Sequence, residues 1–351
     1  MSGDSGRVPV AVDANGADLG PAEVAAGAAL AAEQGARVVI FGSAEEIGEM
    51  PPGVRVVDAP VSIAKEADPV RAARENPDAS IVRAVRAVAS GEAGALVAAG
   101  STGAVVGAGV LHLKRARGIY RPALAIPIPF PGNPVTVLDV GANVTVRPEH
   151  LVQFAFMGAS LAQAVLGIEK PRVALLSNGE EEERGTPLVV EAHAALAERA
   201  AGSPSLTFVG NVEGVELTTG AADVVVTDGF TGNVALKLIE GVSQTMLRAI
   251  RGVATSSLRG KAGGALLRPA LRSFRDDIDP EGQGGAYLLG LRYLAVIPHG
   301  RFTRAGFAQA IVRADLGIRE DVVGTTHSAL EAAGALRSAP ASEQAASVSA
   351  R

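Results

Sequence analysis

Two glycine-containing turns hold the residues of this sequence that are best suited to binding an anion. Gly100-Ser101-Thr102-Gly103 and Asp228-Gly229-Phe230-Thr231-Gly232-Asn233 each follow an apolar run and precede a helical pattern. Glycines after a strand let backbone N–H groups point at a ligand, and the dipole of the following helix attracts negative charge. The alternative is an ordinary strand-to-helix connection with an Asn or Thr cap. We favour a phosphate-handling cleft that includes Ser101, Thr102, Gly103, Gly229, Thr231, Gly232 and Asn233.

Other polar residues also stand where predicted strands end. These candidates for substrate or phosphate binding are Asp13, Asn15, Gly16, Asn143 and Asn178. Four residues could take part in catalysis: Lys237, Asp228, Glu180 and His299. Lys237 could hold charged oxygens, and whether it points back to the cleft is open. Asp228, Glu180 or His299 could transfer protons, since a histidine with a near-neutral pKa suits that task.

Several kinds of chemistry have no signature here. The chain has no cysteine, which excludes disulfides, thiolate metal sites and a cysteine nucleophile. It lacks GxGxxG, GxxxxGK[ST], GxSxG and HExxH patterns, and Gly260-Lys261 is followed by Ala262. We therefore expect no metal and no cofactor.

The elements that must position these residues alternate between short apolar strands and helices. This order predicts a layered α/β/α fold with a mostly parallel sheet, in which ligands bind at the carboxyl ends of the strands. Residues 122–136 contain five prolines and predict an irregular segment or edge strands. Residues 93–113 carry no charge, but their glycines favour a strand, a turn and a buried helix over a membrane span.

Bulk composition limits the function classes. The 351 residues have a net charge of −5 and only 3% aromatic residues, which argues against nucleic-acid binding. The first residues have no apolar signal core, so we expect a cytoplasmic protein. We assign residues 1–337 to a catalytic α/β domain, with two intertwined lobes as an alternative organisation of it, and expect the Ala/Ser-rich residues 338–351 to be disordered.

Residues 241–275 differ from the rest of the chain. They hold seven basic residues and no acidic one, so the remainder carries −12. Apolar residues are interleaved, and Gly260 to Gly264 predicts a turn between two amphipathic helices. Such a hairpin suits an anionic membrane or an acidic protein; the alternative is a solvated face over a dimer-forming stripe. The candidate contacts are Arg248, Arg251, Arg259, Lys261, Arg268 and Arg272.

An ordered series of segments resembles one family. The segments are residues 12–21, 100–104, 138–143, 179–181, 210–214, 228–237 and 284–290, and together they span roughly residues 8–330. They resemble PlsX, the bacterial acyl-acyl-carrier-protein:phosphate acyltransferases. The resemblance implies a fold similar to phosphate acetyltransferases and isocitrate/isopropylmalate dehydrogenases, with a duplicated α/β design.

The resemblance also implies a reaction and partners. Inorganic phosphate attacks the thioester of a long-chain acyl carrier protein, and the acyl phosphate then serves a glycerol-3-phosphate acyltransferase in phospholipid synthesis. Such enzymes are homodimers that associate peripherally with membrane. Two other classes stay open: an NAD(P)-dependent dehydrogenase of related fold, and a non-catalytic membrane or carrier-protein scaffold.

The chain departs from the family pattern at four places. Asn15-Gly16-Ala17 replaces Met-Gly-Gly, Ser101 replaces Asn, Ser177-Asn178 replaces Asn-Ile, and Arg301-Phe302-Thr303 replaces a Ser-Ser-Asp-like stretch. The last change bears on the role of His299 and on the acyl or carrier preference.

Overall fold

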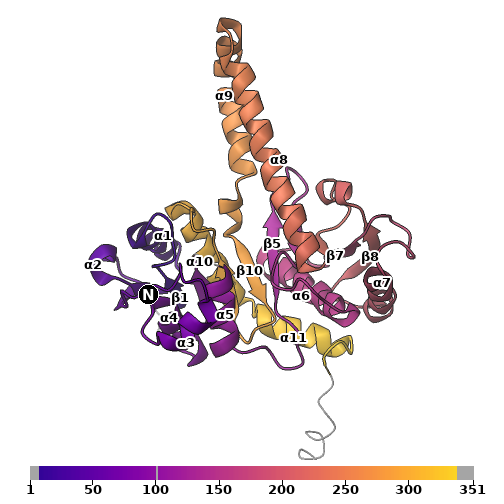
Figure 1. Cartoon of the computed structure of the whole chain (residues 1–351), viewed down its shortest axis with the longest axis horizontal. Coiled ribbons are helices and arrows are strands. Elements are labelled where there is room, and N and C mark those ends of the chain that lie inside the picture. The colour runs from indigo at the N-terminus through magenta and orange to yellow at the C-terminus, as the bar shows by residue number, and fades with distance from the viewer. Residues whose placement is uncertain (1–7, 100–101, 338–351) are drawn as a thin grey trace, which may run out of the picture.

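A single large sheet with helices on both faces forms the body of the protein, and a long helical arm projects from it (Figure 1). The computed structural model describes residues 8–99 and 102–337. Ser101 and the expected disordered tail at 338–351 therefore lie outside the described residues. Eleven strands follow the order β3-β2-β1-β4-β11-β10-β5-β6-β9-β7-β8. The mostly parallel α/β/α architecture predicted from the sequence is confirmed.

The sheet consists of two parallel blocks that run in opposite directions. One block holds β1 (Val10–Asp13), β2 (Val38–Gly42), β3 (Val54–Asp58), β4 (Ala95–Ala98) and β11 (Leu294–Ile297). The other holds β6 (Val135–Leu138), β7 (Arg172–Leu176), β8 (Thr207–Val212) and β9 (Val224–Val226). Between them, β10 (Ala286–Leu289) is antiparallel to both neighbours, and β5 (Ala123–Ile128) is antiparallel to β6.

This reversal corrects the expectation that all strand ends meet at one edge. Asp13 and His299 follow strands of the first block, whereas Asn143, Asn178 and Asp228 follow strands of the second. Because the blocks are antiparallel, their carboxyl ends lie at opposite edges of the sheet. A cleft that joins the two sets must therefore lie over the middle of the sheet.

The proline-rich segment is another correction, because it forms two central strands. Pro127 lies inside β5, but the pairing of β5 with β10 ends at Ala125, opposite Tyr287. Pro127 pairs only with Thr136 of β6. The missing N–H is tolerated here because β5 has one neighbour, rather than two, at this position.

The helices cover the two faces as separate layers. One face carries α1 (Pro21–Glu33), α6 (Pro148–Leu166), α7 (Pro187–Ala200), α10 (Arg304–Arg319) and α11 (Val322–Ala332). The other carries α3 (Pro69–Glu75), α4 (Ser80–Ala89), α5 (Thr102–His112) and the base of α8 (Gly229–Thr255). A short α2 (Ala44–Ile47) follows β2. The predicted strand and helix on either side of residues 100–101 are present as β4 and α5. No helix in the described part of the chain is long and apolar enough to cross a membrane.

The arm consists of α8 and α9 (Leu258–Asp277), which lie side by side and project from the body (Figure 1). The turn falls at Ser256-Ser257, not at the predicted Gly260 to Gly264. Ser257 ends the turn, because its Oγ accepts the N–H of Gly260 at 2.9 Å. Gly260 and Gly264 instead lie inside α9. A Cβ at Gly264 would come within 3.1 Å of the Ala254 side chain, so this glycine lets the two helices approach closely.

Candidate active-site cleft

A cleft of about 600 Å³ lies over the middle of the sheet, where the two blocks meet. Its walls come from the end of β11, the start of β10, β5, the turn after β6 and the first three turns of α8. Leu124, Ile126, Val140, Leu236 and Ile297 give it an apolar floor. Its polar residues are Asn233, Lys237, Glu240, Asp279, Glu281, His299 and Arg301. Helix α8 thus links the opposite edges by running from the end of β9 to the end of β11.

His299 is exposed at the end of β11, in a loop that a neighbouring segment holds in place. The N–H of Asp18 donates to the carbonyl of Gly300 at 2.7 Å. The Nδ1 of His299 accepts the N–H of Arg301 at 3.3 Å, so a neutral ring carries its proton on Nε2. Burial lowers the pKa of His299, and Arg301 lowers it further, while Glu240 opposes this. The ring is therefore neutral at neutral pH and can donate one hydrogen bond from Nε2.

Lys237 lies in the cleft with His299, so helix α8 brings these two candidate residues together. Its Nζ contacts Glu240 Oε2 at 2.9 Å, one turn along α8. The side chain of Lys237 is 63% exposed, so this ion pair contributes little to stability and a ligand anion can compete for the ammonium. Asn233 lies one turn earlier on the same face, beside Gly141.

The turn after β6 is organised by the buried carboxylate of Asp139. Its Oδ1 accepts the N–H groups of Leu124, Gly141 and Ala142 at 3.1, 3.1 and 2.9 Å. Its Oδ2 accepts both the backbone N–H and the side-chain amide of Asn143 at 2.7 Å. Burial raises the pKa of Asp139 against the lowering effect of these bonds. Asn143, predicted to bind substrate, uses its amide for Asp139 and for the carbonyl of Pro122.

The start of α8 does not offer the free N–H groups that the sequence suggested. The Oδ1 of Asp228 accepts the N–H groups of Phe230 and Thr231 at 2.9 Å, and its Oδ2 accepts the Thr231 hydroxyl at 2.7 Å. The N–H of Gly229 donates to the carbonyl of Asn143 at 2.8 Å. Asp228 and Thr231 therefore form a helix cap, the alternative raised from the sequence. Gly229 and Gly232 are needed for close approach: a Cβ at Gly232 would lie 2.0 Å from the carbonyl oxygen of Asp139.

Asp13, Asn15, Gly16, Asn178 and Glu180 are not among the residues that line the cleft. Asp13 is buried at the end of β1, and burial raises its pKa to about 6. Asn15 donates its amide to the carbonyl of Ala59 at 2.9 Å, and Gly16 next to it is buried. Asn178 and Glu180 are exposed in the loop after β7, at the opposite edge from His299. Thr102 and Gly103 begin α5.

Sequence reasoning missed Glu240 and gave Arg301 only as a departure from a family pattern. Glu240 stands three residues after Lys237, and helical spacing predicts that such a pair meets. Arg301 stands two residues after His299. The contact between Lys237 and Glu240 could therefore have been predicted from their spacing in the sequence.

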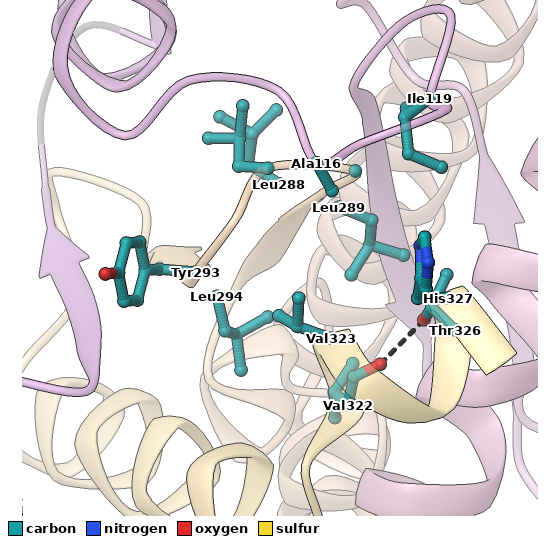
Figure 2. A pocket seen from close by; sticks show the side chains of 12 residues that line it. Ala116, Ile119, Leu288, Leu289, Tyr293, Leu294, Val322, Val323, Thr326 and His327 are labelled. Atoms are coloured by element: carbon teal, nitrogen blue, oxygen red, sulfur yellow. Dashed lines mark hydrogen bonds between the residues drawn. The ribbon is translucent and has the colours of Figure 1, made fainter. Parts of the chain in front are cut away.

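A small cavity of about 20 Å³ lies between β10, the loop before β5 and α11 (Figure 2). Leu288, Leu289, Leu294 and Val323 line it, and the Thr326 hydroxyl next to it donates to the carbonyl of Val322 at 2.7 Å. This volume is about that of one water molecule. The cavity is a gap in packing and offers no room for a substrate.

Comparison with known proteins assigns the chain to a family. A family model described as "Fatty acid synthesis protein" matches residues 8–324. The chain is 42% identical over 301 residues to "Phosphate acyltransferase" from Levilactobacillus brevis, covering 83% of this chain and 86% of that one. It is 40% identical over 334 residues to the protein of that name from Synechococcus elongatus, covering 93% and 95%.

Solved structures agree at the level of the fold. A phosphotransacetylase from Streptococcus pyogenes matches with a TM-score of 0.60 and 17% identity, over 90% of this chain and 95% of that one. EutD phosphotransacetylase from Staphylococcus aureus matches with a TM-score of 0.58 and 14% identity, over 88% and 94%. The sequence matches show more than the fold: the chain belongs to the phosphate acyltransferase family, PlsX, and is an acyltransferase.

Proposed function

We propose that the protein transfers a long-chain acyl group from the thioester of acyl carrier protein to inorganic phosphate. The observation that carries this proposal is the composition of the cleft. Lys237 and Arg301 supply two positive charges, His299 supplies a neutral donor, and the floor is apolar. Three carboxylates also line the cleft, and each already has a partner in the chain. Glu240 pairs with Lys237, Glu281 accepts the N–H and the hydroxyl of Thr303, and Asp279 accepts the N–H of Glu281. Such a cleft suits an anionic nucleophile next to an acyl chain.

The reaction balances without a cofactor. An oxygen of hydrogen phosphate attacks the thioester carbon, the C–S bond breaks, and the proton of hydrogen phosphate ends on the thiol. Lys237 and Arg301 hold the phosphate oxygens. When phosphate binds, Lys237 breaks its ion pair with Glu240 and contacts the phosphate instead. The Nε2–H of His299 donates to the carbonyl oxygen as negative charge develops on it. In this proposal Asp139 and Asp228 position the cleft and transfer no proton.

The arm provides the landing surface for the anionic partners. Arg251, Arg259, Lys261, Arg268 and Arg272 are exposed on it, as are apolar residues such as Leu258 and Leu266, which are 86% and 84% exposed. Basic and apolar residues together suit an anionic membrane surface, and the same charges suit the acidic carrier protein. We further propose a cytoplasmic homodimer that associates peripherally with membrane and passes acyl phosphate to a glycerol-3-phosphate acyltransferase. Co-sedimentation with anionic and neutral vesicles tests the membrane contact, and light scattering tests the dimer.

The absence of cysteine gives a direct assay of the reaction. Purified protein is mixed with palmitoyl-acyl-carrier protein, and free thiol is followed with a thiol reagent, to which the enzyme contributes nothing. We expect release that depends on phosphate and a product that hydroxylamine traps. Lys237→Ala should slow this release, whereas Lys170→Ala, an exposed lysine outside the cleft, should not. Release that proceeds equally without phosphate would refute the proposed acceptor.

A further inference from the structure

A second large depression, of about 1190 Å³, lies at the edge of the sheet where β6 ends. The turn 139–143 separates it from the cleft, because Gly141 lines the cleft while Ala142 and Asn143 line the depression. Four arginines surround it: Arg115, Arg121, Arg147 and Arg337. None of them belongs to the cleft, to the arm or to the residues singled out from the sequence.

The depression is assembled from distant segments that one buried side chain holds together. The Oε1 of Gln153, on α6, accepts the N–H of Tyr120 at 2.8 Å. Its Nε2 donates to the carbonyls of Gly118 and Ala335 at 2.9 and 2.8 Å. The N–H of Arg337 also donates to the carbonyl of Gly118 at 2.8 Å. These hydrogen bonds fix the segments 118–120 and 335–337 to α6, and so hold the arginines in and next to these segments around one depression.

The charge of the depression is largely uncompensated. Arg147 pairs with Glu149 at 3.1 Å, and the guanidinium of Arg115 donates to the carbonyl of Tyr120. Among residues 8–99 and 102–337, Arg121 and Arg337 make no ion pair. The first turn of α6 faces the same space and adds the positive end of a 19-residue helix. Like charges gathered without partners destabilise a fold, so a site that keeps them suits an anionic ligand.

The depression also has an aromatic wall, against which the uncharged part of a small ligand could pack. The Tyr120 ring lies 5.5 Å from that of His150, and the Arg147 guanidinium lies 5.7 Å from the centre of the Tyr120 ring. His150 and Asn143 are buried behind it. Burial lowers the pKa of His150, and Arg147 lowers it further, so the ring is neutral and can contact an uncharged group.

We propose that this depression binds a phosphorylated small molecule. Guanidinium groups match the geometry of phosphate oxygens and hold them by paired, charge-assisted hydrogen bonds. Arg121 and Arg337 hold the phosphate, and the remainder of the molecule packs on Tyr120. A concave site bounded by three fixed segments favours a small ligand over a protein surface. Its occupant contacts the turn 139–143 from the side opposite the cleft.

Isothermal titration of the full chain with inorganic pyrophosphate tests the proposal without relying on turnover. We expect binding that weakens by about 30-fold or more in the Arg121→Gln/Arg337→Gln variant, since two charge-assisted contacts are lost. Arg117→Gln/Arg292→Gln removes the same charge from exposed arginines outside the depression and should bind as the wild type does. Lys237→Ala should also keep this binding, because Lys237 belongs to the cleft.

Three outcomes would overturn the proposal. One is an absence of saturable binding up to about 10 mM pyrophosphate, far above the useful range for a specific site. Another is binding that the Lys237→Ala variant loses and the double arginine variant keeps, which would place pyrophosphate in the cleft. The third is binding of hexaglutamate, but not pyrophosphate, that depends on Arg121 and Arg337, which would indicate an acidic protein partner. Circular dichroism of both double variants checks that they fold.

Discussion

Gly232→Ala tests whether the glycine of the second turn serves a ligand or the packing of the chain. The sequence favours the first role, since glycines after a strand expose N–H groups. In the structure a Cβ at Gly232 would lie 2.0 Å from the carbonyl oxygen of Asp139 and 3.0 Å from its carbonyl carbon. Real Cβ atoms almost never approach within 3.0 Å, so the base of α8 would have to move by about 1 Å.

The magnitude follows from what that movement breaks. Overpacking against rigid backbone costs about 1–3 kcal/mol. The neighbouring hydrogen bond from Gly229 N–H to the Asn143 carbonyl contributes about 1 kcal/mol more. Against these, alanine in a helix gains up to about 1 kcal/mol over glycine. We therefore expect the free energy of unfolding to fall by about 1–3 kcal/mol. A shift of about 1 Å in Asn233 and Lys237 should also slow phosphate-dependent thiol release by about 100-fold.

Gly241→Ala in the same helix is the matched control. Gly241 is exposed and has no atom within 4 Å of an added Cβ, so this variant should be slightly more stable than the wild type. Urea unfolding measures both variants, and a lower midpoint with an unchanged slope identifies a loss of native stability. If Gly232→Ala proves as stable as Gly241→Ala and only raises the KM for phosphate, the packing argument is wrong and the ligand role returns.

Two further predictions concern titrating groups. Burial raises the pKa of Asp13 from 3.8 to about 6, so the folded state holds the proton more tightly and stability should fall as the pH rises through this range. The loss of stability is about 3 kcal/mol. Unfolding measured at several pH values should show that the Asp13→Asn variant lacks this pH dependence. An unchanged pH dependence in that variant would contradict the assignment of the effect to Asp13. Burial and Arg301 lower the pKa of His299, and protonation of its Nδ1 would break the hydrogen bond from the Arg301 N–H that orients the ring. The rate of thiol release should therefore fall only below the usual histidine range. His299→Gln should lose this acid limb while it keeps a weaker hydrogen-bond donor, and a limb that persists in the variant would exclude His299 as its cause.

The sequence was sufficient for most of the elements but not for their directions. Short apolar strands such as Val224–Val226 look the same whichever way they run, because both faces are buried and no alternation marks them. The opposed blocks arise where β10 and β5 run antiparallel to their neighbours, and residues 122–136 gave no local sign of this beyond their prolines. The placement of His299 relative to Asn143 therefore depended on pairings between residues far apart in the chain.

The candidate site was predictable where its residues lie on one helix. It was not predictable where a carboxylate of the chain can take the backbone N–H groups that a ligand would use. Lys237 and Asn233 share a face of α8, which their spacing of four residues in one helix is enough to predict. The glycine turn at residues 228–233 was misleading for a physical reason, whereas Gly100 and Ser101 of the other turn lie outside the described residues. A carboxylate of the chain and a phosphate oxygen accept the same N–H groups, so the sequence of a phosphate-binding turn resembles that of a turn closed by its own Asp. Asp139 and Asp228 take that place here.

Helix α8 belongs to both the cleft and the arm. It runs for 27 residues, about 40 Å, and its first three turns hold Asn233, Lys237 and Glu240 in the cleft. The rest of the same helix carries Arg248 and Arg251 into the arm. Because Asp228 caps its start and Gly232 is in close contact with Asp139, the base of the helix cannot move without the turn after β6. A partner that displaces the arm must therefore either bend α8 above the cleft or shift Lys237 relative to His299.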